Sequence, residues 1–149
     1  FSIVDTFGSM YKEDLQRVFF LIHHNLVATS KVGFHSHNNL QMSFALSQEF
    51  AEMTQGLREI VIDATMAGMG RGAGNTNTEL VMQFMNRRYN SGYDIDSVLD
   101  LTTLTLSVTG ANGATLFLTF WQDLIVPMLT ILPIFPPRQV SPAATSTIC

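Results

Sequence analysis

Residues 31–64 read KVGFHSHNNLQMSFALSQEFAEMTQGLREIVIDA, and this stretch decides the fold. A short apolar run at about residues 31–37 predicts one strand, and residues 60–64 predict another. Four apolar residues between them recur at helical spacing: Leu46, Phe50, Met53 and Leu57. Asn38 or Asn39 can cap this helix. A strand, a helix and a second strand in this order predict a parallel sheet with helices packed on it.

The same alternation continues on both sides of this stretch. Residues 3–4 predict a short strand, after which Ser9 can cap a helix. The apolar residues of that helix also recur at helical spacing: Leu15, Val18, Phe19 and Ile22. On the other side, the glycine-rich loop 68–74 leads into a helix that begins near Thr76, where Thr76 and Glu79 have the spacing of a capping box. This alternation predicts an α/β fold with parallel strands and right-handed crossovers.

Composition and charge exclude several classes of protein. The chain has 149 residues with 8 Lys+Arg, 12 Asp+Glu and a formal net charge of -4. So few basic side chains argue against the basic surface that a nucleic-acid-binding protein needs. The single cysteine, Cys149, excludes both an intramolecular disulfide and a cysteine-based zinc site.

The composition changes near Leu101. Beyond it, Asp123 and Arg138 are the only charged residues, and all of the prolines lie there. The apolar run 114–135 is long enough to span a bilayer, but Gln122, Asp123 and two prolines interrupt it. A membrane anchor is therefore a poor explanation of this tail.

Two histidines, His35 and His37, are alternate residues of a predicted strand and therefore point to the same face. They lie toward its carboxyl end, where α/β proteins bind their ligands. The spacing leaves two interpretations open, a metal site or two polar histidines at a strand end, because imidazole is the commonest metal ligand but also a common polar side chain. The adjacent His23 and His24 point apart on a helix and indicate a solvated helix end.

Alternating glycines occupy the loop that follows the third strand: Gly68, Gly70, Gly72 and Gly74. Such a loop lets the backbone approach a ligand closely and directs N–H groups toward an anion. The loose dinucleotide-binding pattern is also satisfied, but no acidic residue ends a strand about 20 residues further on. A loop that only needs left-handed conformations is the structural alternative.

Three segments in order resemble successive strand-end motifs of the DRE-TIM metallolyases, the HMG-CoA lyase-like superfamily. They are residues 4–10 (VDTFGSM), 32–40 (VGFHSHNNL) and 62–75 (IDATMAGMGRGAGN). Within this superfamily, the three motifs most resemble those of the 4-hydroxy-2-oxovalerate aldolases. The resemblance implies that residues 1–100 are the C-terminal part of a TIM (β/α)8 barrel, about its last three βα units. Residues 101–149 would then be a hydrophobic tail outside the family pattern.

The resemblance also implies a metal site. His35 and His37 would bind a divalent cation, Mn²⁺ or Mg²⁺, and Asn75 would lie on or near it. The substrate-binding residues would be the glycines of the loop: Gly68, Gly70, Gly72 and Gly74. The catalytic groups are expected in the first half of the barrel, outside this sequence, so the chain alone is expected to be inactive.

The implied activity is cleavage of a carbon–carbon bond in a 2-oxo acid, which yields pyruvate and an aldehyde. Two departures leave the subfamily open, because Asn38 stands where the aldolases carry His and Asn39 stands where isopropylmalate and homocitrate synthases carry Asp. The glycine loop favours the aldolases, and Arg71, which fits neither subfamily, faces either solvent or a substrate anion. The alternatives are a synthase-like acyl-CoA carboligase and a non-catalytic remnant.

The expected partners are a small 2-oxo acid and either further copies of the chain or a partner dehydrogenase, with no nucleic acid and no membrane. The expected location is the cytoplasm.

A shift of reading frame explains the tail best. Residues 112–123, back-translated and read from the third base of the Asn112 codon, can encode WGYSIPYFLAG. That peptide resembles a segment that aldolase-domain proteins of this type carry just after the barrel. We therefore expect residues 101–149 to be a frameshifted or aberrant product without a selected function.

Overall fold

The structure is a computed structural model that describes residues 1–109 and 129–131. Three parallel strands form the sheet in the order of the chain: β1 (Ser2–Asp5), β2 (Val32–Ser36) and β3 (Ile60–Ala64). The helices that alternate with them and follow them are α1 (Lys12–Asn25), α2 (Ser43–Thr54), α3 (Thr78–Tyr89) and α4 (Ile95–Thr109), with a short 3-10 turn, η1 (Met66–Gly68), after β3. The predicted α/β fold is confirmed, and the arrangement is that of part of a TIM barrel.

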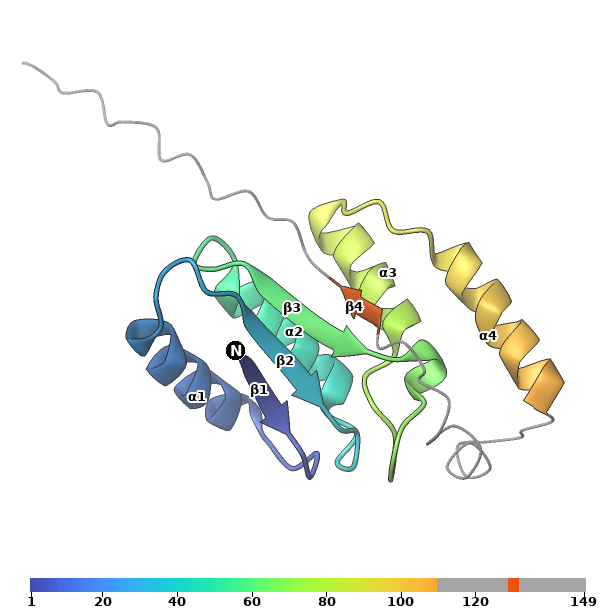
Figure 1. The fold of residues 1–149 in the computed structure, drawn as a ribbon, viewed down its shortest axis with the longest axis horizontal. Helices are drawn as coiled ribbons and strands as arrows, with labels where there is room; N and C mark the ends of the chain where they lie inside the picture. The colour runs from blue at the N-terminus through green and yellow to red at the C-terminus, as the bar shows by residue number, and fades with distance from the viewer. Residues whose placement is uncertain (110–128, 132–149) are drawn as a thin grey trace, which may run out of the picture.

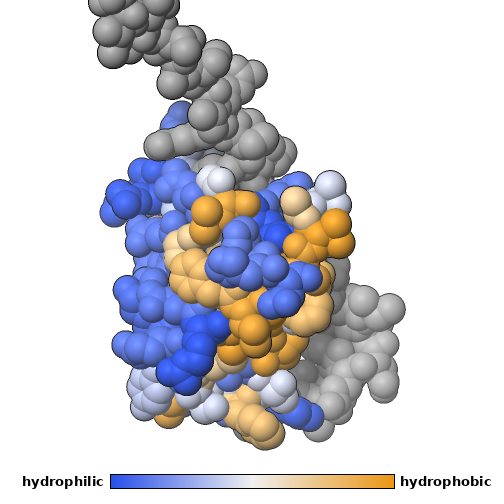
Figure 2. Space-filling model, turned by 90° about the vertical axis from the view of Figure 1, so that its left-hand side faces the viewer, coloured by the Kyte–Doolittle hydropathy of each residue, from blue (hydrophilic) through white to orange (hydrophobic). Residues whose placement is uncertain are grey.

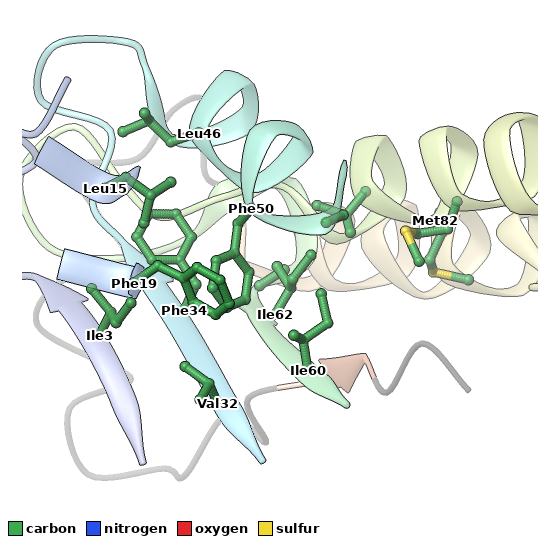
Figure 3. Packing of buried hydrophobic residues seen from close by; sticks show 14 of the residues in the cluster. Ile3, Leu15, Phe19, Val32, Phe34, Leu46, Phe50, Ile60, Ile62 and Met82 are labelled. Carbon is green, nitrogen blue, oxygen red and sulfur yellow. The ribbon is translucent and has the colours of Figure 1, made fainter. Parts of the chain in front are cut away.

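The hydrophobic core lies between the sheet and the helices α1 and α2 (Figure 1). Alternate residues of each strand point toward these helices, as the pleat requires. Figure 3 shows Ile3, Phe34 and Ile62 of the strands facing Phe19 and Phe50 of the helices. The Phe50 ring lies 5.4 Å from that of Phe34 and 5.8 Å from that of Phe19, measured between centroids. This packing fixes the register of the strands that carry the candidate site.

On the opposite face of the sheet, the side chains of Val4, His35 and Asp63 lie side by side across the three strands. Val4 of β1 is the register partner of His35 of β2, which is in turn the partner of Asp63 of β3. Val4 is 51% exposed, whereas the strand residues that face the helices are buried. In a closed barrel this row would point toward the interior.

Three helices begin later than predicted. Asn38 or Asn39 was predicted to cap the second helix, but α2 starts at Ser43, whose N–H donates to Asn38 Oδ1 at 3.2 Å. Ser9 was predicted to cap α1, but its N–H donates to the Asp5 carboxylate at 3.0 Å, and the helix starts at Lys12. The predicted capping box at Thr76 is also wrong, because α3 starts at Thr78 and the carboxylate of Glu79 accepts a hydrogen bond from Ala67 N–H at 3.1 Å.

Two features that were not predicted lie at or beyond the predicted domain boundary at residue 101. The helix α4 continues across it to Thr109, and Thr102 is 9% exposed. A further strand, β4 (Leu129–Ile131), pairs with β3 in the antiparallel direction. Residues 110–128 and 132–149, which include the segment of the predicted frameshift and most of the apolar run, lie outside the described residues.

Apolar residues gather on the side of the molecule where α1 and β1 lie (Figure 2). The exposed large hydrophobic residues of this region include Phe1, Val4, Phe20 and Leu21. The strand β1 ends the sheet here, and an edge strand beside apolar residues favours association with another chain. Within the described residues, no helix has both the length and the apolar character needed to cross a membrane.

Candidate metal centre

The predicted site residues lie at the carboxyl ends of β2 and β3. His35 is within β2, His37 follows directly after it, and Asn75 comes from the glycine loop after β3. An isolated antiparallel bridge pairs His37 with Asn75, so the loop returns to the end of the neighbouring strand. The structure therefore brings together residues that are far apart in the sequence.

The two imidazoles lie close to one another. The ring centroids of His35 and His37 are 5.2 Å apart, with an angle of 75° between the ring planes. The His35 side chain is 17% exposed, so it is largely shielded from solvent. Neighbouring imidazoles on one face can bind the same cation if they rotate toward a common point.

The amide of Asn75 has one partnered end and one unpartnered end. Its Nδ2 donates to the carbonyl oxygen of Met69 at 3.1 Å, which fixes the orientation of the side chain. Its Oδ1 is buried and accepts no hydrogen bond from the described residues. A buried amide oxygen without a donor is costly, and such an atom calls for a ligand or an ion.

Gly70 lies directly against this same amide. A β-carbon on Gly70 would lie 2.4 Å from Asn75 Nδ2, and one on Gly74 would lie 2.2 Å from the carbonyl oxygen of Gly68. Gly68, Gly72 and Gly74 also have positive φ angles. The loop thus has structural reasons for its glycines, and substrate binding by Gly68, Gly70, Gly72 and Gly74 stays a prediction.

The two asparagines that each depart from one subfamily pattern, Asn38 and Asn39, connect the loops of the site. Asn38 Oδ1 accepts hydrogen bonds from the N–H and the hydroxyl of Ser43, at 3.2 and 2.8 Å, where α2 begins. Asn39 Oδ1 accepts from the N–H of Ala73 in the glycine loop at 3.2 Å. Arg71, at the tip of that loop, is exposed. The departures at 38 and 39 therefore have local structural roles.

Asp63 is the residue of this region that the sequence analysis missed. Its carboxylate Oδ2 lies 3.6 Å from His35 Nδ1, and its side chain is 20% exposed. Its position beside His35 depends on the register between β2 and β3, which the sequence did not reveal.

The donor set fits a divalent cation but is incomplete. Two imidazole nitrogens and one amide oxygen are ligands of the kinds that Mn²⁺ accepts. Among the described residues, no cluster of three or more His, Cys, Asp or Glu side chains is placed to hold a metal ion. His35, His37 and Asn75 would therefore supply part of a coordination shell.

The sequence model of the HMGL-like family matches residues 1–106. The chain belongs to the HMGL-like family. The predicted membership of the HMG-CoA lyase-like superfamily is thereby confirmed. The match includes the histidine pair, the glycine loop and most of α4.

Similar proteins point to the same family. The chain is 30% identical to a 4-hydroxy-2-oxovalerate aldolase of a Marinomonas species over 126 residues, 84% of this chain and 30% of the relative. It is 33% identical to an oxaloacetate decarboxylase of Mycobacterium tuberculosis over 99 residues, 66% of this chain and 28% of the relative. The N-terminal domain of a putative aldolase from Bacteroides vulgatus superposes with a TM-score of 0.65 and 28% identity, over 74% of this chain and 35% of that chain. The chain thus spans about a third or less of the proteins it matches.

Proposed function

We propose that this HMGL-like chain supplies part of the metal and substrate site of an aldolase that cleaves a 4-hydroxy-2-oxo acid into pyruvate and an aldehyde. The observation that carries the proposal is the buried, unpartnered Oδ1 of Asn75, on a residue paired with His37. The backbone of Asn75 is paired with that of His37, so this residue lies at the strand end that carries the two imidazoles, and its amide oxygen has no hydrogen-bond partner among the described residues. A cation bound there would supply the missing partner.

His35, His37 and Asn75 are the residues that would hold the cation, and Mn²⁺ is favoured over Mg²⁺ because two of the three donors are imidazoles. A bound divalent cation would polarise the ketone of a 2-oxo acid and stabilise the negative charge that develops on its oxygen as the carbon–carbon bond breaks.

The glycine loop would bind the anionic part of the substrate. The backbone N–H groups of Gly70 and Gly72 donate no hydrogen bond within the described residues. Both groups lie in the same loop as Asn75, so a carboxylate bound there would be near the cation. The exposed guanidinium of Arg71, between these glycines, adds positive charge to the same loop.

The oxaloacetate decarboxylase among the relatives supports the broader reaction class and offers a second candidate substrate. Oxaloacetate is also a 2-oxo acid. Its decarboxylation, like the aldol cleavage, breaks the bond between C3, the carbon next to the ketone, and C4. The site residues described here serve either reaction. The groups that choose between an aldehyde and CO₂ as the leaving fragment would belong to the rest of the site.

Calorimetric titration with oxalate tests the proposal, because oxalate has the two adjacent oxygen donors of a 2-oxo acid. We expect the full chain to bind oxalate in the presence of Mn²⁺ and to bind it much more weakly without Mn²⁺. Acetate, which cannot chelate in the same way, is the matched control ligand. Binding of oxalate that is independent of Mn²⁺, or equal in a His35→Gln, His37→Gln double variant, would contradict the proposal.

A further inference from the structure

We infer that Asp63 is a positioning residue that holds the His35 imidazole with its proton on Nδ1 and thereby leaves Nε2 as the nitrogen that can bind a cation. The role of the tautomer in metal binding rests on the proposed function. The control of the tautomer by Asp63 is a separate claim that can be measured without any metal.

The sheet itself places the carboxylate beside the ring. Asp63 and His35 are register partners on neighbouring parallel strands, so their side chains leave the same face of the sheet at the same level. The contact joins Oδ2 of Asp63 to Nδ1 of His35 at 3.6 Å, slightly longer than a hydrogen bond. A small rotation of either side chain would close it, and neither strand has to move.

Of the two residues that lie opposite His35 on the neighbouring strands, Asp63 is the polar one. The register partner on the other side is Val4, whose side chain offers no acceptor. His37 lies next along the same face, with its ring 5.2 Å from that of His35. Among the described residues, His35 is the basic side chain that lies within 4.0 Å of the Asp63 carboxylate.

A carboxylate beside Nδ1 stabilises the N–H at that nitrogen and disfavours the tautomer that carries its lone pair there. Because both side chains are at most one-fifth exposed, water competes weakly for this contact. The same contact limits rotation of the ring. A histidine that is already oriented loses less conformational entropy when it binds a cation.

Two properties separate this role from a purely structural one. A structural ion pair would require an imidazolium, which carries a proton on both nitrogens and has no tautomer, whereas the role inferred here acts on the neutral ring. A carboxylate that itself bound the cation would converge on it together with the histidines, yet no such cluster of three occurs among the described residues.

The test is nitrogen NMR of the full metal-free chain labelled with ¹⁵N-histidine, at a pH where the imidazoles are neutral. We expect His35 to carry its proton mainly on Nδ1 in the wild-type chain. In Asp63→Ala we expect a clear shift of population toward the Nε2–H tautomer. Asp63→Asn keeps the size and hydrogen-bonding capacity but loses the charge, so we expect an intermediate shift, and this variant decides the matter if Asp63→Ala does not fold.

Val61→Ala is the matched control, since Val61 lies on the same strand and the same face but pairs with Gly33. It should leave the His35 tautomer unchanged. Mn²⁺ affinity, measured on the same samples, should fall about 10- to 100-fold in Asp63→Ala and less in Asp63→Asn. An unchanged tautomer in both Asp63 variants would overturn the inference. Failure of the wild-type chain to bind Mn²⁺ through His35 would contradict the proposed function and leave the tautomer result to be judged separately.

Discussion

At the scale of single residues, the contact between Gly70 and Asn75 is the most sensitive part of the candidate metal centre. A β-carbon at position 70 would lie 2.4 Å from Asn75 Nδ2, and the φ angle of Gly70 is not positive. Replacement by alanine therefore acts through this contact and not through backbone strain. The amide would have to turn or shift, which would move the unpartnered Oδ1.

We accordingly expect Gly70→Ala to weaken Mn²⁺ binding by about 10-fold, as measured by calorimetric titration. Gly33→Ala is the matched control, because Gly33 also has an ordinary φ and the atom nearest to its added β-carbon would be the Ser2 hydroxyl, which can rotate away. Equal affinities of the two variants would show that Asn75 does not contribute to the site.

The residue types of the site were predictable from the sequence, but their partners were not. Strand alternation placed His35 and His37 on one face, and the structure confirms it. The association of His35 with Asp63 depends on which residue of β3 lies opposite His35 in β2. That register is set by the packing of large residues such as Phe34 and Phe50 on the other face, which no local pattern specifies.

At the scale of the elements, Asp5 organises the connection from β1 to α1. It is 3% exposed, and its carboxylate accepts the N–H groups of Ser9 and Met10 at 3.0 and 3.2 Å. The backbone carbonyl of Asp5 also accepts the N–H of His37 at 3.3 Å. One residue therefore supports both the β1 loop and the end of the strand that carries the histidines.

Asp5→Ala should lower the free energy of unfolding by about 3 kcal/mol, because two hydrogen bonds to a buried carboxylate are lost. Urea denaturation would show this as a lower midpoint with an unchanged slope. Thr6→Ala, an exposed change in the same loop, should leave the midpoint close to that of the wild type. A midpoint equally unaffected by Asp5→Ala would mean that the loop does not depend on the carboxylate.

The C-terminal end of α1 is sensitive to pH through His23. Burial, followed by the nearby Arg58 guanidinium, lowers the pKa of His23 below its ordinary value of 6.5. The unfolded chain therefore takes up this proton more readily than the folded chain. The stabilising contribution of neutral His23 is present above pH 6.5 and is lost as the pH falls through the lower pKa of the folded state.

We expect a His23→Gln variant to lose less stability than the wild type between about pH 7 and pH 5, as measured by the urea midpoint at each pH. His24→Gln is the control, since it removes an exposed imidazole on the same helix. If the wild type and His23→Gln respond alike to acidification, the neutral form of His23 does not contribute to folding.

The strands of the sheet were more predictable than the starts of the helices. The bounds of β3 agree with the prediction, because a short apolar run between polar residues is a local signal. The predicted starts of α1, α2 and α3 were all too early. At α1, Asp14 accepts the N–H of Tyr11, and at α3, Glu79 accepts the N–H of Ala67 across a loop. A capping pattern predicts a helix start only when no distant group claims the same atoms.

At the scale of the whole molecule, the part of the chain beyond α4 is chemically unlike the rest. Its charged residues are Asp123 and Arg138. Removal of residues 110–149 should therefore raise the soluble fraction, although the loss of β4 leaves the β3 edge unpaired. Mn²⁺ affinity should not change, because His35, His37 and Asn75 precede the deletion.

A shorter chain that ends at residue 101, where the composition changes, is the comparison for the chain of residues 1–109. This truncation cuts α4 and removes Thr102, which is 9% exposed and whose hydroxyl donates to the carbonyl of Val98 at 2.8 Å. This shorter chain should unfold at a lower urea concentration than the chain of residues 1–109. Loss of folding or of Mn²⁺ binding in the 1–109 chain would show that the tail belongs to the domain, and the frameshift hypothesis would then be wrong.

The central claim is that His35 and His37 form part of a divalent-metal site, and Mn²⁺ titration of the full chain tests it most directly. The four histidines provide the matched comparison. His23 and His24, which were expected to point apart, have ring centroids 5.3 Å apart, and those of His35 and His37 are 5.2 Å apart. We predict that the wild-type chain binds Mn²⁺, that a His35→Gln, His37→Gln double variant does not, and that a His23→Gln, His24→Gln double variant binds like the wild type. Equal binding by the wild type and the His35→Gln, His37→Gln variant would contradict the claim.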